Sequence, residues 1–150
     1  MHAGTFNNDV ITMVAGLTGL RDVYTPQVAT EFLVTGNRFR DELNAIAREK
    51  GVAIQAVGIG SVMTFHFHNQ PVRTPEQLAL GHPDAEALFH LAMLERGIYL
   101  ASRGFVSLSI VQTEEDLTAF KEAFANVLNT YGALFNEVAE VAELTEVAEA

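Results

Sequence analysis

Apolar side chains recur at helical spacing in four stretches of the chain. They run from Val10 to Leu20, from Thr25 to about Lys50, from Asp84 through Arg96, and from Thr113 to Tyr131. Residues three and four positions apart lie on one side of a helix, so each stretch predicts a helix with one buried side. In the third helix we expect that side to contain the leucines and a nearby phenylalanine: Leu88, Leu91, Leu94 and Phe89.

Capping residues indicate where these helices begin and end. Thr25 and Pro26 suit the N-cap and first helical positions, and Gly51 suits the stop. Thr113 precedes three acidic residues, which the helix dipole favours in a first turn. Asp84 is a candidate cap for the third helix.

Between the second and third helices the apolar pattern changes to period two. Residues 52–56 and 62–68 are rich in β-formers, and the glycines between them predict a turn or bulge. Alternation over 63–68 puts Met63, Phe65 and Phe67 on a core face, and Thr64, His66 and His68 on a polar, exposed face. Two further strands are expected at 98–100 and 105–111, joined by a turn at 101–104.

These elements predict an α+β fold, with a first helix followed by a small, mostly antiparallel sheet that helices cover on one face. We divide the chain into residues 1–24, the small domain 25–135, and a tail 136–150. In the tail a glutamate recurs at every third position from Glu137 to Glu149. A three-residue repeat drifts around a helix, so we expect a frayed acidic helix or a mobile tail.

Composition narrows the class of protein. Hydrophobic residues make up 49% and charged residues 19% of the 150 positions, which favours a folded chain over a disordered one. The net charge of −10 argues against nucleic acid as a partner. No apolar run is long enough to span a membrane, and we expect a cytoplasmic location. Because there is no cysteine, the chain can form neither a disulfide nor a thiolate metal site.

Few residues carry candidate chemistry. Gly4, Thr5 and Phe6 precede the first helix, where a hydroxyl and free N–H groups can bind a phosphate, although such residues also serve as simple caps. Arg103 lies in the 101–104 turn. Its guanidinium can hold a carboxylate with two bonds, or it is a solvated turn residue.

Histidines and lysines offer weaker candidates. His66 and His68 on one strand face can bind a divalent metal, but a third ligand is not evident, and a polar exposed face is the simpler interpretation. We therefore assign no metal site. Lys50 and Lys121 are the only lysines, and neither sequence context suggests the desolvation that activates a Schiff-base lysine.

Several segments together resemble the class III aminotransferases, the fold-type-I pyridoxal-phosphate enzymes. Within that family they are most similar to β-phenylalanine aminotransferases and then to glutamate-1-semialdehyde aminomutases. The segments that carry the resemblance are Gly4-Thr5-Phe6-Asn7-Asn8, Val23-Tyr24-Thr25-Pro26, Gly58-Ile59-Gly60-Ser61-Val62-Met63, Leu94-Glu95-Arg96-Gly97-Ile98-Tyr99 and Ser102-Arg103-Gly104-Phe105-Val106. The likeness spans roughly residues 2–135, but only the C-terminal part of the family.

The resemblance implies specific roles. Gly4, Thr5 and Phe6 would bind the phosphate of pyridoxal 5'-phosphate in the neighbouring subunit, and Arg103 would bind the substrate carboxylate. The first helix, with its small residues Ala15, Gly16 and Gly19, would lie near a homodimer interface. The family's cofactor lysine, its pyridine-binding aspartate and its stacking aromatic all lie upstream of Gly4 and have no counterpart here.

We therefore expect the C-terminal portion of a transaminase that acts on a β-amino acid or a related carboxylate-bearing amine. It would be inactive without the large domain, and we assign it no catalytic residue. One alternative is a non-catalytic module that dimerises or regulates through residues 10–20. A weaker alternative is a metal-dependent activity at His66 and His68.

Overall fold

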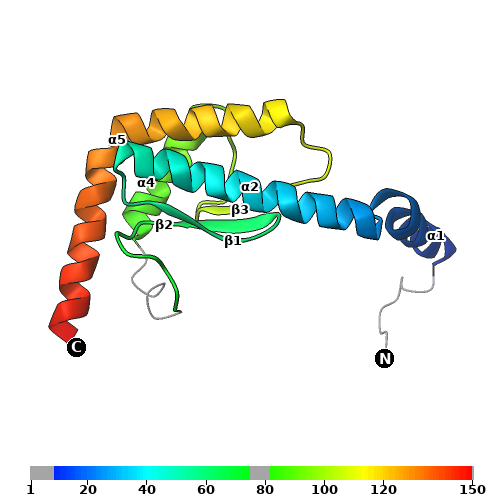
Figure 1. The fold of residues 1–150 in the computed structure, drawn as a ribbon, viewed down its shortest axis with the longest axis horizontal. Coiled ribbons are helices and arrows are strands. Elements are labelled where there is room, and N and C mark those ends of the chain that lie inside the picture. The colour runs from blue at the N-terminus through cyan, green and yellow to red at the C-terminus, as the bar shows by residue number, and fades with distance from the viewer. Residues whose placement is uncertain (1–8, 75–81, 150) are drawn as a thin grey trace.

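The computed structural model describes residues 9–74 and 82–149, with side chains as far as Glu140 (Figure 1). The predicted motif Gly4-Thr5-Phe6 lies outside these residues. The described elements, in chain order, are α1 (Val10–Thr18), the π-helical turn η1 (Gly19–Val23), α2 (Pro26–Lys50), β1 (Gln55–Ile59), β2 (Val62–His66), α4 (Pro83–Leu94), β3 (Phe105–Ser107) and α5 (Glu114–Glu149). Within the described part of the chain, no helix is long and apolar enough to cross a membrane.

The three strands form one antiparallel sheet in the order β1-β2-β3. Ala56 pairs with Phe65, and Met63 pairs with Val106. Helix α2 runs along β1, and the first part of α5 lies beside α2, with Phe124 of α5 in contact with Phe65 of β2 (Figure 1). The predicted α+β class, with helices over one face of a small antiparallel sheet, is confirmed.

Phenylalanine rings join the sheet to α4 and α5. Phe65 of β2 lies with its ring centroid 4.9 Å from that of Phe89 and 5.2 Å from that of Phe124. Phe67 makes a similar contact, 4.9 Å from Phe135. Such pairs contribute about 0.5–1.5 kcal/mol each beyond area burial, so β2 and the strand end that follows it are the centre of the core. The alternation predicted for Met63, Phe65 and Phe67 is confirmed, since all three are buried.

The predicted caps of α2 and α5 are confirmed. The Thr25 hydroxyl accepts a hydrogen bond from the Val28 N–H at 3.3 Å, and Gly51 adopts a left-handed conformation (φ 63°) that ends α2. Thr113 and Asp116 cap α5 reciprocally. The Asp116 carboxylate accepts from the Thr113 N–H at 2.7 Å, and the Thr113 hydroxyl accepts from the Asp116 N–H at 3.2 Å. The bonds that the Asp116 carboxylate accepts, from the Thr113 N–H and then from the Thr113 hydroxyl, lower the pKa of Asp116.

Helix α4 differs from its prediction at both its start and its buried face. It begins at Pro83 with His82 at the N-cap position, so Asp84 lies in the first turn and is not the cap. Its buried side consists of Ala85, Phe89, Ala92 and Met93. The predicted core residues Leu91 and Leu94 are 55% and 44% exposed. Phe89 decides the orientation, because its ring packs among four other phenylalanines of the core.

The strands also differ from their predicted limits. β1 covers residues 55–59, later than the predicted 52–56, and residues 98–100 form no strand. β3 ends at Ser107, although the apolar run predicts a strand to Val111. The last ladder bond runs from the Leu108 N–H to the Ser61 carbonyl at 2.8 Å. Directly after it, the Gln112 side chain accepts from the Ser109 N–H and turns the chain toward α5.

The two ends of the chain contribute differently to the core. Helix α1 is capped by Asp9, whose side chain accepts from the Thr12 N–H, but α1 contains no buried residue. At the other end α5 continues as helix to Glu149, and Phe135 and Ala139 are fully buried. Residue 135 is therefore not an element boundary, and the division of the chain at 24 and 135 stays a prediction.

Candidate functional site

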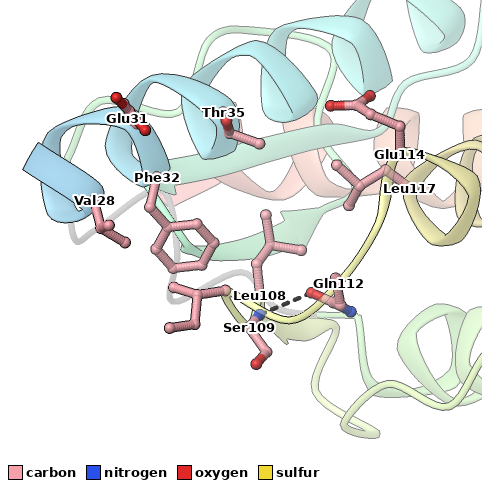
Figure 2. A pocket seen from close by; sticks show the side chains of 10 residues that line it. Val28, Glu31, Phe32, Thr35, Leu108, Ser109, Gln112, Glu114 and Leu117 are labelled. Atoms are coloured by element: carbon pink, nitrogen blue, oxygen red, sulfur yellow. Dashed lines mark hydrogen bonds between the residues drawn. The ribbon is translucent and has the colours of Figure 1, made fainter. Parts of the chain in front are cut away.

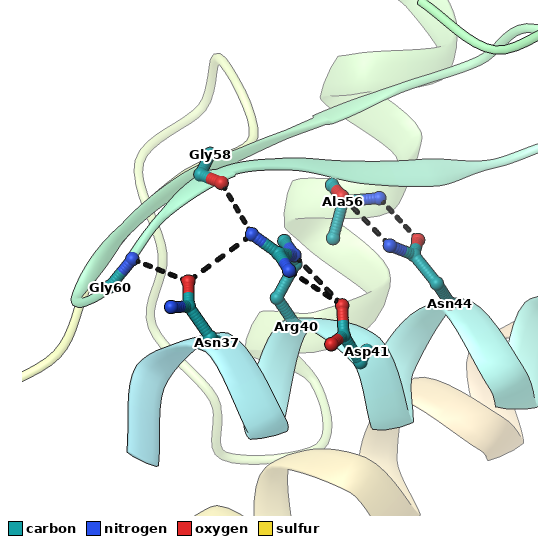
Figure 3. Close-up of polar contacts among 7 residues, drawn as sticks. All are labelled: Asn37, Arg40, Asp41, Asn44, Ala56, Gly58 and Gly60. Carbon is teal, nitrogen blue, oxygen red and sulfur yellow. Dashed lines mark hydrogen bonds and ion pairs between the residues drawn. The ribbon is translucent and has the colours of Figure 1, made fainter. Parts of the chain in front are cut away.

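The β1–β2 hairpin is positioned by polar side chains of α2. Asn44 pairs with Ala56 of β1 as a neighbouring strand would. Its Nδ2 donates to the Ala56 carbonyl at 2.9 Å, and its Oδ1 accepts from the Ala56 N–H at 2.8 Å (Figure 3). Because an amide side chain offers one donor and one acceptor, it satisfies both outward groups of this residue.

Two further α2 side chains continue this contact toward the hairpin turn. Arg40 Nη1 donates to the Gly58 carbonyl at 2.7 Å, and Asn37 Oδ1 accepts from the Gly60 N–H at 2.9 Å (Figure 3). Arg40 is therefore not simply a solvated surface charge, because its guanidinium holds the hairpin backbone. The signal in the sequence is the spacing of Asn37, Arg40 and Asn44, which places three hydrogen-bonding side chains on one helix face.

The predicted turn at 101–104 is present and holds Arg103. The Gly104 N–H donates to the Ala101 carbonyl at 2.9 Å, and the Gly104 carbonyl accepts from the Phe65 N–H at 3.1 Å. Gly104 has φ 71° and lies against Phe65, where a Cβ would be 3.2 Å from the Phe65 carbonyl oxygen. The turn is thus fixed to the central strand of the sheet.

Arg103 itself is exposed. No described residue accepts a hydrogen bond from its guanidinium. A charged fork on a rigid turn, with its donors unused within the described residues, is suited to binding a carboxylate from outside. Gly4, Thr5 and Phe6 lie outside the described residues, so the predicted site that combines them with Arg103 stays a prediction.

Both lysines are engaged in contacts between α2 and α5. Lys50 Nζ donates to Asn129 Oδ1 at 2.6 Å, and Lys121 forms an ion pair with Glu42 at 2.7 Å. Neither lysine has surroundings that fit covalent attachment of an aldehyde cofactor.

The histidines are arranged differently from the prediction. His68 is not on an exposed face but is only 4% exposed. The strand ends at His66, and the chain then turns so that the His68 N–H donates to the Ala53 carbonyl and its Nδ1 accepts from the Gln70 N–H.

Two histidines, His66 and His82, have a lowered pKa, mainly because of burial. For His66 the pKa falls mainly through burial and then through the neighbouring His68. For His82 burial also dominates; Glu86 opposes it and His68 adds to it. Within residues 9–74 and 82–140, no three His, Asp or Glu side chains are grouped so that they could hold a metal ion.

A cavity of about 250 Å³ lies between the start of α2 and the loop that leads to α5 (Figure 2). Phe32, Leu108 and Leu117 give it an apolar wall, and Glu31 and Glu114 add two acidic groups. None of the described residues that line it is basic. Because a phosphate or carboxylate needs positive charge or N–H donors, this cavity does not suit an anionic ligand.

The chain is similar to known aminotransferases. No family model matches it. It is 40% identical over 133 residues to the β-phenylalanine transaminase of Variovorax paradoxus. The aligned residues make up 89% of this chain and 31% of that protein. The chain is 32% identical to the glutamate-1-semialdehyde 2,1-aminomutase of Campylobacter fetus, over 81% of this chain and 30% of that protein. The chain thus spans about 30% of the length of these relatives.

Solved structures give the same result. The crystal structure of a β-phenylalanine aminotransferase from Variovorax paradoxus matches with a TM-score of 0.83 at 40% identity, over 89% of this chain and 31% of the other. An ω-transaminase from Sphaerobacter thermophilus matches with a TM-score of 0.68 at 32% identity, over 86% of this chain and 30% of the other.

Proposed function

The chain is homologous to one part of the class III aminotransferases, and from this relationship we propose that it forms the C-terminal part of a pyridoxal-phosphate-dependent transaminase. The observation that carries the proposal is the match to the Variovorax paradoxus enzyme, at 40% identity with a TM-score of 0.83. The substrate class that we propose is a β-amino acid or a related carboxylate-bearing amine, in keeping with the name of that relative.

In this function pyridoxal 5'-phosphate supplies the electron sink for amino-group transfer. The residues of this chain would bind the cofactor phosphate and orient the substrate. Gly4 and Phe6 would offer backbone N–H groups, and Thr5 a hydroxyl, to the phosphate of the neighbouring subunit's cofactor. Arg103 would hold the substrate carboxylate with two charge-assisted bonds, which fixes the amine relative to the cofactor.

We propose that these 150 residues are inactive alone. A transaminase needs a lysine that carries the cofactor and moves a proton. The engagement of Lys50 with Asn129 and of Lys121 with Glu42 supports the view that this lysine comes from the large domain.

The partners that we propose are that large domain and a second subunit, in a cytoplasmic homodimer. Helix α1 and the turn η1 support a partner, because Val10 and Ile11 of α1 and Leu20 of η1 are exposed. Gly16 and Gly19 have open space beside them within the described residues, so another helix can approach closely there.

The test uses a chimera in which this chain replaces the matching 133 residues of the Variovorax paradoxus relative. We expect the chimera to transaminate β-phenylalanine. Arg103→Ala should raise KM about 10–100-fold, since charge-assisted hydrogen bonds contribute about 1.5–3 kcal/mol. Arg48→Ala, which removes another exposed arginine, is the matched control and should leave KM within twofold.

If the two substitutions change KM equally, Arg103 does not bind the substrate. An inactive chimera, together with a stable dimer of the isolated chain, would favour the alternative of a non-catalytic dimerising module.

A further inference from the structure

The two edges of the sheet differ in how their backbone groups are satisfied. At β1, the side chains of Asn37, Arg40 and Asn44 bind outward-facing groups of the hairpin (Figure 3). This edge is therefore closed by helix α2. A strand edge without such cover offers unpaired N–H and C=O groups to another strand.

β3 is the other edge, and its ladder shows which groups face outward. On either side of the Met63–Val106 pair, Gly104 bonds to Phe65 of β2, and Leu108 bonds to Ser61, which directly precedes β2. Since antiparallel pairing alternates, Phe105 and Ser107 direct their N–H and C=O groups away from β2. The Phe105 carbonyl accepts from the Ala101 N–H at 3.3 Å. The Phe105 N–H and both Ser107 backbone groups have no partner among the described residues.

A cavity of about 580 Å³ follows this open edge. Residues 97–101 line it opposite β3, and Leu117 and Phe120 of α5 line it as well. The sequence predicts a strand at 98–100, but the single bond from Ala101 to Phe105 is the only one that joins the two segments in the described structure. Tyr99 remains 82% exposed.

We propose that the β3 edge is a docking site for one extended segment of the same enzyme, supplied by the polypeptide that lies outside these 150 residues. This inference rests on the proposed function. The length of the relatives supports it. The region that matches this chain is only 31% of the Variovorax paradoxus protein, so that protein has further polypeptide that could provide such a segment. The segment forms main-chain bonds to Phe105 and Ser107 and directs alternate apolar side chains toward Leu117 and Phe120.

A second copy of the chain is a poorer occupant of this edge. β3 has three residues, and residues 97–101 stand opposite it in every copy. If the β3 strands of two copies paired with each other, residues 97–101 of each copy would have to fit beside the other copy. A single extended segment carries no such residues.

The test compares amide hydrogen exchange in the isolated chain and in the chimera. In the isolated chain, the Phe105 and Ser107 amides should exchange faster than the Val106 amide, which bonds to β2. In the cofactor-loaded chimera, they should be slowed at least tenfold. Unchanged exchange in a chimera that binds pyridoxal phosphate would overturn the docking site and leave the proposed function standing. A chimera that binds no cofactor would overturn both.

A pair of substitutions separates edge pairing from general stability. Ser107→Pro removes the outward N–H, which an edge strand tolerates, and Ser107→Thr keeps it. We expect the proline variant of the chimera to lose the slow exchange at Phe105, and the threonine variant to retain it. Slow exchange that persists in a folded proline variant would contradict the proposal. If that variant does not fold, the comparison of the unmodified proteins decides. Slowing that appears in the isolated chain as its concentration rises would assign the edge to a second copy and also overturn the proposal.

Discussion

At the residue scale, the contact between α2 and the turn that joins β1 to β2 depends on a glycine. A Cβ at Gly36 would lie 2.1 Å from the Gly60 carbonyl oxygen, and this backbone cannot easily move. We predict that Gly36→Ala lowers the free energy of unfolding by about 3 kcal/mol, the upper end for overpacking.

Urea denaturation of the isolated chain measures this effect. Gly16→Ala is the matched control, because nothing lies within 4 Å of its Cβ position, and it should leave the midpoint unchanged. A Gly36→Ala variant as stable as this control would show that α2 does not cross the hairpin at this position.

Asn44 gives a second residue-scale prediction. Asn44→Ala leaves the N–H and carbonyl of Ala56 without their partner, so we expect a loss of about 1–3 kcal/mol. Asn129→Ala removes an asparagine that accepts one exposed bond from Lys50, and it should change stability by less than about 0.5 kcal/mol. Thermal denaturation of both variants tests the difference, and similar losses would contradict the role of Asn44.

The histidines predict how stability depends on pH. Burial lowers the pKa of His66 and His82 below the ordinary value of 6.5 that they keep in the unfolded chain. The unfolded state therefore binds more protons near and below that value. The stabilising effect of neutral histidines is complete above pH 6.5 and is lost as the pH falls.

Urea midpoints measured from pH 8 to pH 5.5 test this dependence. We expect the midpoint to fall over the acidic half of that range, and to fall less in a His66→Gln, His82→Gln double variant. An identical decline in both proteins would assign the pH dependence to other groups.

Some residues of the candidate site were predictable and others were not. The turn that holds Arg103 was predictable from its sequence, whereas the role of Arg103 in a site stays a prediction that rests on the family resemblance. The burial of His68 was missed, since alternation holds only while the strand continues, and this strand ends at His66. Arg40 was missed because a charged residue on a helix surface usually stays in solvent.

At the scale of elements, α1 is separate from the core. It has nine residues and none of them is buried. Helices this short are marginal in water without tertiary contacts. We predict that deleting residues 1–24 leaves the urea midpoint of the isolated chain unchanged within error, but abolishes activity in the chimera, where α1 and Thr5 have partners.

Circular dichroism of the truncated chain makes the stability measurement. A clear loss of stability on truncation would show that α1 packs on the small domain, and would contradict the division of the chain at residue 24.

The elements were predictable where local chemistry determines them. Thr25, Pro26 and Gly51 mark the limits of α2, and Thr113 marks the start of α5. The buried face of α4 was not predictable, because its leucines and Phe89 compete for the core and only the phenylalanine cluster decides. The expected strand at 98–100 failed for a related reason. A strand needs a partner, and none of the described residues supplies one.

At the scale of the whole molecule, the features that remain unexplained within the chain all concern its surface. The apolar residues of α1, the free guanidinium of Arg103 and the open edge of β3 each lack a partner among the described residues. This chain spans about 30% of the length of its relatives, so most of each relative has no counterpart in these 150 residues. Under the proposed function, these features would be completed by a second subunit at α1, by the substrate at Arg103 and by a segment of the large domain at β3.

The most direct test of this account is a titration of the isolated chain and of the chimera with pyridoxal phosphate, each followed by borohydride reduction and peptide mass mapping. The account predicts no modified lysine in the isolated chain. In the chimera it predicts a single modified lysine, outside residues 1–150, together with transaminase activity. Specific modification of Lys50 or Lys121 with activity in the isolated chain would contradict it.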